Sequence, residues 1–132
     1  ARWSKEAGVG ELVKTYVADA LDFEGASDGY DVVGLFYAHM PNDIRQLFHR
    51  KAMSWLKPGG KIILEGFNSR QLTLHSGGPK DATMLFNIAQ LESDFQGLVM
   101  EQMETVQTTL DEGPFHQGKA EIIRMVGTAP QL

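Results

Sequence analysis

The chain has 132 residues, the length of one domain, and 42% of them are hydrophobic, which is enough to build a buried core. Its net charge of -5 argues against a nucleic-acid partner, and no apolar run approaches the roughly 20 residues of a membrane-spanning helix, so small molecules or proteins are the expected partners. The absence of cysteine excludes disulfides, thiolate metal sites and cysteine nucleophiles, and it fits a reducing, cytoplasmic environment.

The first half of the chain alternates predicted strands and helices. Residues 12–17 favour a short strand, and residues 30–37 (YDVVGLFY) are too apolar to face solvent, which predicts a buried central strand. Residues 42–56 then predict a helix with one apolar face and with Asn42 as its N-cap. The apolar positions of that face are Ile44, Leu47, Phe48, Ala52, Trp55 and Leu56.

A glycine-rich junction follows this helix. In Lys57-Pro58-Gly59-Gly60, proline cannot continue the helix and glycine permits the reversal. Residues 61–67 predict a second buried strand. Strand, helix and strand together predict a βαβ unit with parallel strands, and functional residues are expected at the carboxyl ends of such strands.

The last third of the chain departs from this alternation. Residues 68–82 are rich in Gly, Ser and Pro and predict a long loop, and residues 87–95 predict a short capped helix. Residues 99–110 fit both helical spacing and a β-branched strand, and we interpret them as a strand. Gly113, Pro114 and Gly118 indicate a connection to a closing strand at 120–127. The predicted fold is α/β, with a mostly parallel sheet that ends in an antiparallel hairpin.

These motifs occur in a recognisable order. Asp19-Ala20-Leu21-Asp22-Phe23, YDVV, His39-Met40-Pro41, LKPGG, IILEGF and GGPK follow one another before the hairpin. This order resembles the second half of a class I S-adenosylmethionine-dependent methyltransferase, in particular the small-molecule or tellurite-resistance-like members. The resemblance implies a single domain over residues 1–132, the substrate-side part of a Rossmann-like fold, with S-adenosylmethionine as cofactor and a small-molecule acceptor.

One family feature has no counterpart in the chain. Family members bind the cofactor with a Gly-x-Gly loop after their first strand. Gly8-Val9-Gly10 follows a predicted helix end instead of a strand, so we interpret it as a connection. Relative to the family, the chain would begin before the third strand, which leaves cofactor binding by this chain alone in doubt. A non-catalytic module that forms homo-oligomers through an exposed sheet edge is therefore the alternative function.

The resemblance also assigns site residues. It places Asp19 and Ala20 beside the adenine, although Asp19 could instead cap a turn. It places Phe36, His39 and Met40 beside the cofactor and the transferred methyl group. His39 is the catalytic candidate, because an imidazole can orient or deprotonate an acceptor near neutral pH. The alternative is a histidine that only bonds the backbone at the helix entrance.

The remaining candidates concern substrate and metal. Arg45, Arg70, Lys80 and His116 lie near loops that could close over the strand ends, and they are candidate substrate contacts; the alternative is ordinary solvated surface. The four histidines, His39, His49, His75 and His116, lack the short-range pairing of common zinc sites, so no metal is predicted.

Overall fold

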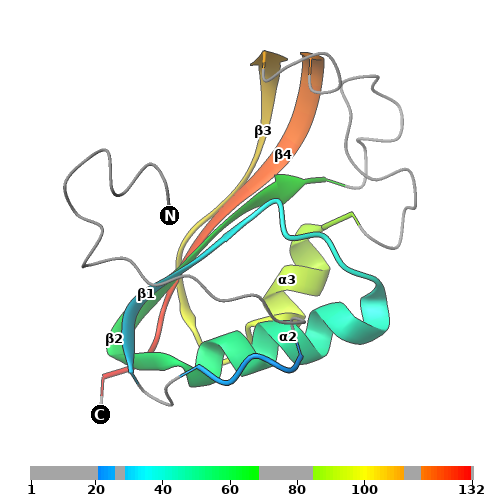
Figure 1. Ribbon diagram of the computed structural model, residues 1–132. Coiled ribbons are helices and arrows are strands. Elements are labelled where there is room, and N and C mark those ends of the chain that lie inside the picture. Colours follow the sequence, from blue (N-terminus) through cyan, green and yellow to red (C-terminus); the bar gives the residue numbers. More distant parts are fainter. Residues whose placement is uncertain (1–20, 26–28, 69–84, 112–116, 132) are drawn as a thin grey trace, which may run out of the picture.

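The computed structural model describes residues 21–25, 29–68, 85–111 and 117–131, and Figure 1 shows how they are arranged. These ranges contain a four-stranded sheet and two helices. The elements in chain order are β1 (Tyr30–Phe36), α2 (Asn42–Ser54), β2 (Leu56–Phe67), α3 (Ile88–Asp94), β3 (Val99–Asp111) and β4 (Gln117–Thr128). The strand predicted at residues 12–17 lies outside the described residues, as does most of the loop predicted at 68–82. Within the described part, no helix is long and apolar enough to cross a membrane.

The sheet is mixed, with strand order β1-β2-β4-β3. β1 and β2 are parallel and are joined by α2, as expected for a βαβ unit. β4 pairs antiparallel with both β2 and β3, and the pairing of β3 with β4 runs from Val99–Thr128 to Asp111–Gln117. The α/β class, the strand at 99–110 and the closing hairpin are therefore confirmed. Two details differ from the prediction. The described sheet is not mostly parallel, because only one of its three strand pairings is parallel. Gly118 lies inside β4 instead of in the connection before it.

The prediction that residues 30–37 form a buried central strand is wrong for the described sheet, in which β1 is an edge strand. Leu35 points into the core and is 7% exposed, whereas Val32 and Phe36 are 54% and 61% exposed. The apolar sequence alone did not distinguish the two cases, because a strand's place in a sheet depends on the segments that pair with it.

Both helices cover the same face of the sheet (Figure 1). Ile62 and Leu64 of β2 and Ile123 and Met125 of β4 lie on this face and are almost completely buried. They belong to one core cluster with residues of the helices and of the turns that follow them, among which are Ala52, Trp55, Leu91 and Phe95. The sheet and the helices therefore share one core on the side that we call the helix face.

α2 begins at Asn42 as predicted, but it ends at Ser54 instead of residue 56, and Leu56 is the first residue of β2. Its buried side agrees with the prediction only in part. The buried helical residues are Arg45, His49 and Ala52, whereas Leu47 is 59% exposed. The N-cap is Pro41 and makes no side-chain cap, so the prediction that Asn42 is the N-cap is also wrong. Asn42 is the first helical residue, and its side-chain oxygen accepts a hydrogen bond from Arg45.

The glycine-rich junction proves to be part of β2. Gly59 has a φ of +80°, and its N–H donates to the carbonyl of Ala129, while the N–H of Ala129 donates to the carbonyl of Gly60. A Cβ on Gly60 would lie 2.9 Å from the carbonyl oxygen of Lys57 and 3.0 Å from that of Tyr30. Glycine is required at position 60 because three backbone segments meet there.

The predicted capped helix near residue 87 is confirmed. The side chain of Asn87 accepts a hydrogen bond of 2.8 Å from the N–H of Gln90 at the start of α3. Just before it, Phe86 forms a parallel bridge with Asn68, and its N–H donates to the carbonyl of Phe67. The chain thus leaves β2 and returns beside the same strand end before α3 begins.

Candidate functional site

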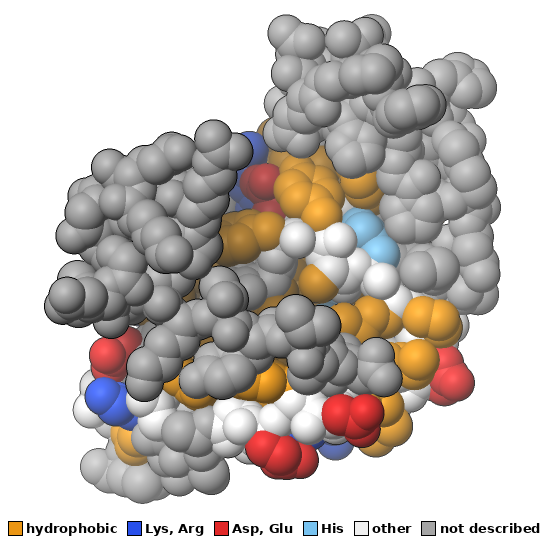
Figure 2. All heavy atoms as spheres, viewed as in Figure 1, with side chains coloured by type: hydrophobic (Ala, Val, Ile, Leu, Met, Phe, Trp, Pro, Cys, Tyr) orange, Lys and Arg blue, Asp and Glu red, His pale blue; other side chains and the backbone are white. Residues whose placement is uncertain are grey.

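The candidate site lies where β1 and β2 end at their carboxyl termini. The chain leaves β1 at Phe36 and enters α2 through Tyr37, His39 and Pro41. In parallel α/β sheets this edge is where ligands bind. Figure 2 shows hydrophobic side chains beside a histidine, near an acidic and a basic side chain, on the surface in this view.

Two consecutive aromatic residues end up on the face opposite the helices. Phe36 pairs with Glu65, and partners in a parallel pair point to the same face. Tyr37 would normally point the other way, but its φ of +56° breaks the alternation, and its hydroxyl donates a 2.9 Å hydrogen bond to Glu65. A left-handed conformation costs a non-glycine residue on the order of 1 kcal/mol, so surrounding contacts must hold Tyr37 in place.

The side chains around Tyr37 supply those contacts. The ring of Tyr37 packs edge-on against Phe67 at 5.1 Å, and the second carboxylate oxygen of Glu65 accepts a 2.6 Å bond from Arg124 on β4. The hydrogen bond with Glu65 raises the pKa of Arg124. Tyr37, Glu65 and Arg124 thus form a polar row that crosses β2 from the end of β1 to β4.

His39 lies on the opposite side of the sheet from Tyr37, next to the helix face. Its Nε2 accepts a 3.1 Å hydrogen bond from the N–H of Phe67, which requires that nitrogen to be unprotonated. Its ring is stacked on Phe86 at 4.6 Å and on Phe67 at 5.6 Å. His39 therefore ties the segment after β1 to the end of β2.

Gly66 makes room for this stack. A Cβ at position 66 would lie 2.3 Å from a ring carbon of Phe86 and 3.4 Å from Cε1 of His39. We expect Gly66→Ala to lower the free energy of unfolding by about 1–3 kcal/mol, because the buried ring of Phe86 must move. Chemical denaturation measures the loss, and Gly66→Ala combined with Phe86→Leu should recover part of it. An unchanged stability of Gly66→Ala would show that the stack is loosely packed.

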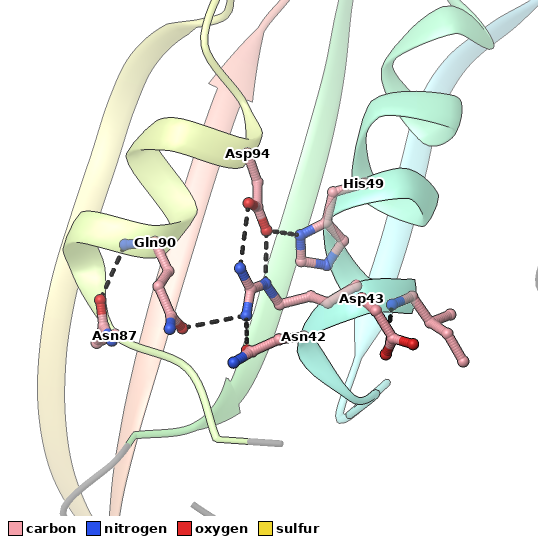
Figure 3. Close-up of polar contacts among 8 residues, drawn as sticks. Asn42, Asp43, His49, Asn87, Gln90 and Asp94 are labelled. Atoms are coloured by element: carbon pink, nitrogen blue, oxygen red, sulfur yellow. Dashed lines mark hydrogen bonds and ion pairs between the residues drawn. The ribbon is translucent and has the colours of Figure 1, made fainter. Parts of the chain in front are cut away.

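A buried polar cluster lies between the two helices, as Figure 3 shows, and the ring of Phe86 lies beside its histidine. His49 lies 6.0 Å from the ring of Phe86, is stacked on Phe95 at 4.5 Å, and is 1% exposed. Its Nδ1 lies 2.8 Å from Oδ2 of Asp94, and that oxygen also accepts a 2.7 Å bond from Nε of Arg45. The row of rings His39, Phe86, His49 and Phe95 therefore runs from the candidate site to this cluster.

The charge state of the cluster follows from its contacts. Burial alone would raise the pKa of Asp94, but hydrogen bonds from His49 and Arg45, together with their charges, hold its pKa below the ordinary 3.8. Arg45 bonds both oxygens of Asp94 and also the side chains of Asn42 and Gln90. The ion pair of Arg45 and Asp94 is thus buried and well satisfied, the condition under which a buried pair is tolerated.

The predicted site residues fall into three groups. Phe36 ends β1, and His39 and Met40 follow it, but the side chains of Phe36 and His39 lie on opposite sides of the sheet. Arg45 is only 7% exposed and bonded to Asp94, so contact with a substrate would require it to leave that carboxylate, and its substrate role stays a prediction. The other five lie outside the described residues: Asp19, Ala20, Arg70, Lys80 and His116.

The sequence did not point to Tyr37, Glu65, Phe86 or Asp94. The one available signal was polar spacing, because Arg45 and His49 lie four residues apart on the side of α2 that carries Ala52. Within the described ranges, no group of three or more acidic or histidine side chains is arranged to hold a metal ion.

Comparison with known proteins identifies the fold. Neither a protein-family model nor a curated protein matches the chain. Several solved structures are similar to it. TehB from Haemophilus influenzae has a TM-score of 0.72 and 9% sequence identity, and the match covers 97% of this chain and 44% of TehB. A SAM-dependent methyltransferase from Methanosarcina mazei has a TM-score of 0.64 and 11% identity, and the match covers 89% of this chain and 67% of that protein. The cyclase SpnF is also similar, with a TM-score of 0.71 and 12% identity, and the match covers 100% of this chain and 62% of SpnF.

These likenesses extend over nearly all of this chain but not over the whole of the other proteins. The chain spans less than two thirds of the length of TehB and of SpnF. At such low identities they establish the fold and leave the chemistry open, and a cyclase among them illustrates that one fold serves different reactions.

Proposed function

We propose that this chain, whose fold is that of class I S-adenosylmethionine-dependent methyltransferases, transfers a methyl group from that cofactor to a small molecule in the cytoplasm. The observation that carries the proposal is the likeness to methyltransferase structures over 89% or more of the chain, with Phe36 and His39 at the strand ends. The likeness to TehB supports the tellurite-resistance-like branch that the sequence resembles.

The described residues fit the cofactor in one clear respect. Phe36 presents a ring that is 61% exposed at the carboxyl end of β1, and a purine could stack on it. When bound, S-adenosylmethionine supplies a sulfonium methyl group that the lone pair of an acceptor can attack. The protein's contribution is then to hold the acceptor in line with that methyl group. Asp19 and Ala20 remain the proposed adenine contacts, and Arg70, Lys80 and His116 the proposed acceptor contacts.

We assign His39 a positioning role within this function. The lone pair of Nε2 accepts the N–H of Phe67, so taking a proton from an acceptor at Nε2 would break that hydrogen bond. The bond and the stack on Phe86 instead fix the segment that carries Phe36 and Met40. His39 would therefore shape the site more than it would move a proton.

A second function has support from a different observation. β1 is an edge of the described sheet, and Val32 and Phe36 are exposed on it. A non-catalytic module that self-associates through this edge is the alternative to a methyltransferase. The two proposed functions differ in whether the chain binds the cofactor.

Calorimetric titration with S-adenosylhomocysteine, the product form of the cofactor, tests the proposed activity. We expect saturable binding near one ligand per chain, with affinity about tenfold weaker for Phe36→Ala. Leu47→Ala is the matched control, because Leu47 is 59% exposed on α2 and lies outside the site. A folded chain that binds no ligand would overturn the methyltransferase proposal for this chain and favour the alternative.

A further inference from the structure

The buried cluster of Arg45, His49 and Asp94 between the helices is not accounted for by stability alone. All three side chains are almost completely buried. The attraction within a buried ion pair offsets little more than the cost of removing both charges from water, and apolar residues of similar volume are often as stabilising. Apolar residues cannot supply direction, however, because only hydrogen bonds fix the angles between the groups that they join.

The guanidinium of Arg45 supplies that direction where α2 begins (Figure 3). Its Nε and Nη2 donate to the two carboxylate oxygens of Asp94 at 2.7 and 3.3 Å. Its Nη1 donates to the side-chain oxygens of Asn42 and, at 3.3 Å, of Gln90. One planar group thus joins the first residue of α2 to two positions one turn apart on α3. The rigid fork of arginine permits these bonds over only a narrow range of helix positions.

The start of α2 is joined to the candidate site by a short length of backbone. The carbonyl of Pro41 accepts a 2.8 Å hydrogen bond from the N–H of Arg45, so Pro41 is fixed to the first turn of the helix. His39 lies two residues earlier, and its Nε2 accepts the N–H of Phe67. The segment 39–41 is therefore held at one end by β2 and at the other end by the turn that Arg45 orients.

A second set of contacts reaches His39 through side chains. Nδ1 of His49 lies 2.8 Å from Asp94, and the ring of His49 lies 6.0 Å from that of Phe86. Phe86 is in turn stacked on His39 at 4.6 Å. Because the carboxylate of Asp94 holds both Arg45 and His49, it acts on His39 through the backbone and through the rings.

We propose that Arg45 and Asp94 are positioning residues, which fix where α2 begins against α3 and thereby set the position of His39 at the candidate site. They act through His39 without contact with a ligand, which differs from the substrate contact expected of Arg45 from the sequence. The effect on ligand affinity rests on the proposed methyltransferase function. The position of His39 can be measured without any ligand.

Two variants separate position from stability. Arg45→Met combined with Asp94→Leu removes the directed bonds and leaves no buried charge, so we expect this double variant to fold. Arg45→Lys keeps a positive charge beside Asp94 but loses the planar fork, and it gives an independent measurement if the double variant does not fold. Ile62→Val is the control for a loss of stability alone, because it shortens a buried side chain near the start of β2.

Proton NMR of the histidine ring signals measures the position of His39. The chain has four histidines, so the signals of His39 are assigned by their loss in His39→Gln. We expect these signals to shift in both Arg45 variants and to keep their positions in Ile62→Val. Unshifted signals in the folded Arg45 variants, or an equal shift in Ile62→Val, would overturn the positioning role.

Calorimetry with S-adenosylhomocysteine tests the effect on ligand binding. We expect the affinity to fall about tenfold in both Arg45 variants and to stay unchanged in Ile62→Val. Shifted His39 signals without a loss of affinity would overturn the part of the proposal that concerns binding. A native chain that binds no ligand would overturn the methyltransferase function, and the NMR measurement would still decide whether Arg45 and Asp94 position His39.

Discussion

Asp94→Asn should lower the free energy of unfolding by about 3–5 kcal/mol, the largest effect expected of a single polar substitution in the described chain. Asp94 is 1% exposed and receives hydrogen bonds from Arg45 and His49. Its carboxylate is what balances the guanidinium of Arg45, which is itself 7% exposed. Removing the negative charge leaves a buried cation without its counter-ion.

Chemical denaturation of matched variants measures this loss. Glu92→Gln removes a carboxylate from the exposed side of the same helix, and we expect a change within about 0.5 kcal/mol. Replacing both partners, as Arg45→Met with Asp94→Leu, should recover much of the stability because no buried charge remains. If Asp94→Asn were no worse than Glu92→Gln, the ion pair would not contribute as described.

The same carboxylate gives a defined dependence on pH. Its pKa in the folded chain lies below the ordinary 3.8, so the charged form is favoured by folding. Its stabilisation is complete above the unfolded-state pKa and is lost as the pH falls through the lower, folded-state value. The part of the difference in unfolding free energy between the native chain and Asp94→Asn that comes from the titration of Asp94 itself should thus be constant down to about pH 5, and should shrink in more acidic solution.

Phe86→Ala should cost about 3–5 kcal/mol, because it removes a ring that is 1% exposed and opens a cavity between the sheet and the helices. The ring packs against His39 and His49 and lies over Gly66, so no neighbouring side chain can easily fill the space. The loss of its contact with His39 should also change the environment of that imidazole. Proton NMR of the histidine ring signals would report this change.

Phe36→Ala is the matched control for the ring. It removes the same side chain from a position that is 61% exposed, so the free energy of unfolding should change by no more than about 0.5 kcal/mol. Similar losses for both variants would contradict the burial of Phe86 and its place in the row of rings. An unchanged His39 signal in Phe86→Ala would show that the two rings are not in contact.

Local patterns predicted the secondary structure well because the signals are short in range. The start of α2, the cap at Asn87 and the strand at 99–110 all follow from residues within one element. The place of β1 in the sheet was missed because strand order depends on other segments of the chain. Leu47 was assigned to the buried side of α2 because apolar spacing assumes that the core is apolar, whereas Arg45 and His49 occupy that side.

The candidate site could be predicted only in part for the same reason. Phe36 ends β1 and His39 and Met40 follow it, so their place near one strand end was expected from the chain order, whereas the opposite sides on which Phe36 and His39 lie were not. Asp94 lies 49 residues from Arg45 and 45 from His49, and no local pattern links them. Tyr37 depends on a backbone angle that its residue type does not favour, which the sequence could not reveal.

The bridge between Asn68 and Phe86 holds together the two described ends of the stretch that lies between them in the sequence. Its two ends are neighbours whatever its length, and the start of α3 is set by Phe86 and Asn87. Doubling the length of such a segment costs only about 0.6 kcal/mol in closure entropy. A change in the length of this stretch should therefore leave the register of β2 and the place of α3 the same, because both are set by contacts of Asn68, Phe86 and Asn87.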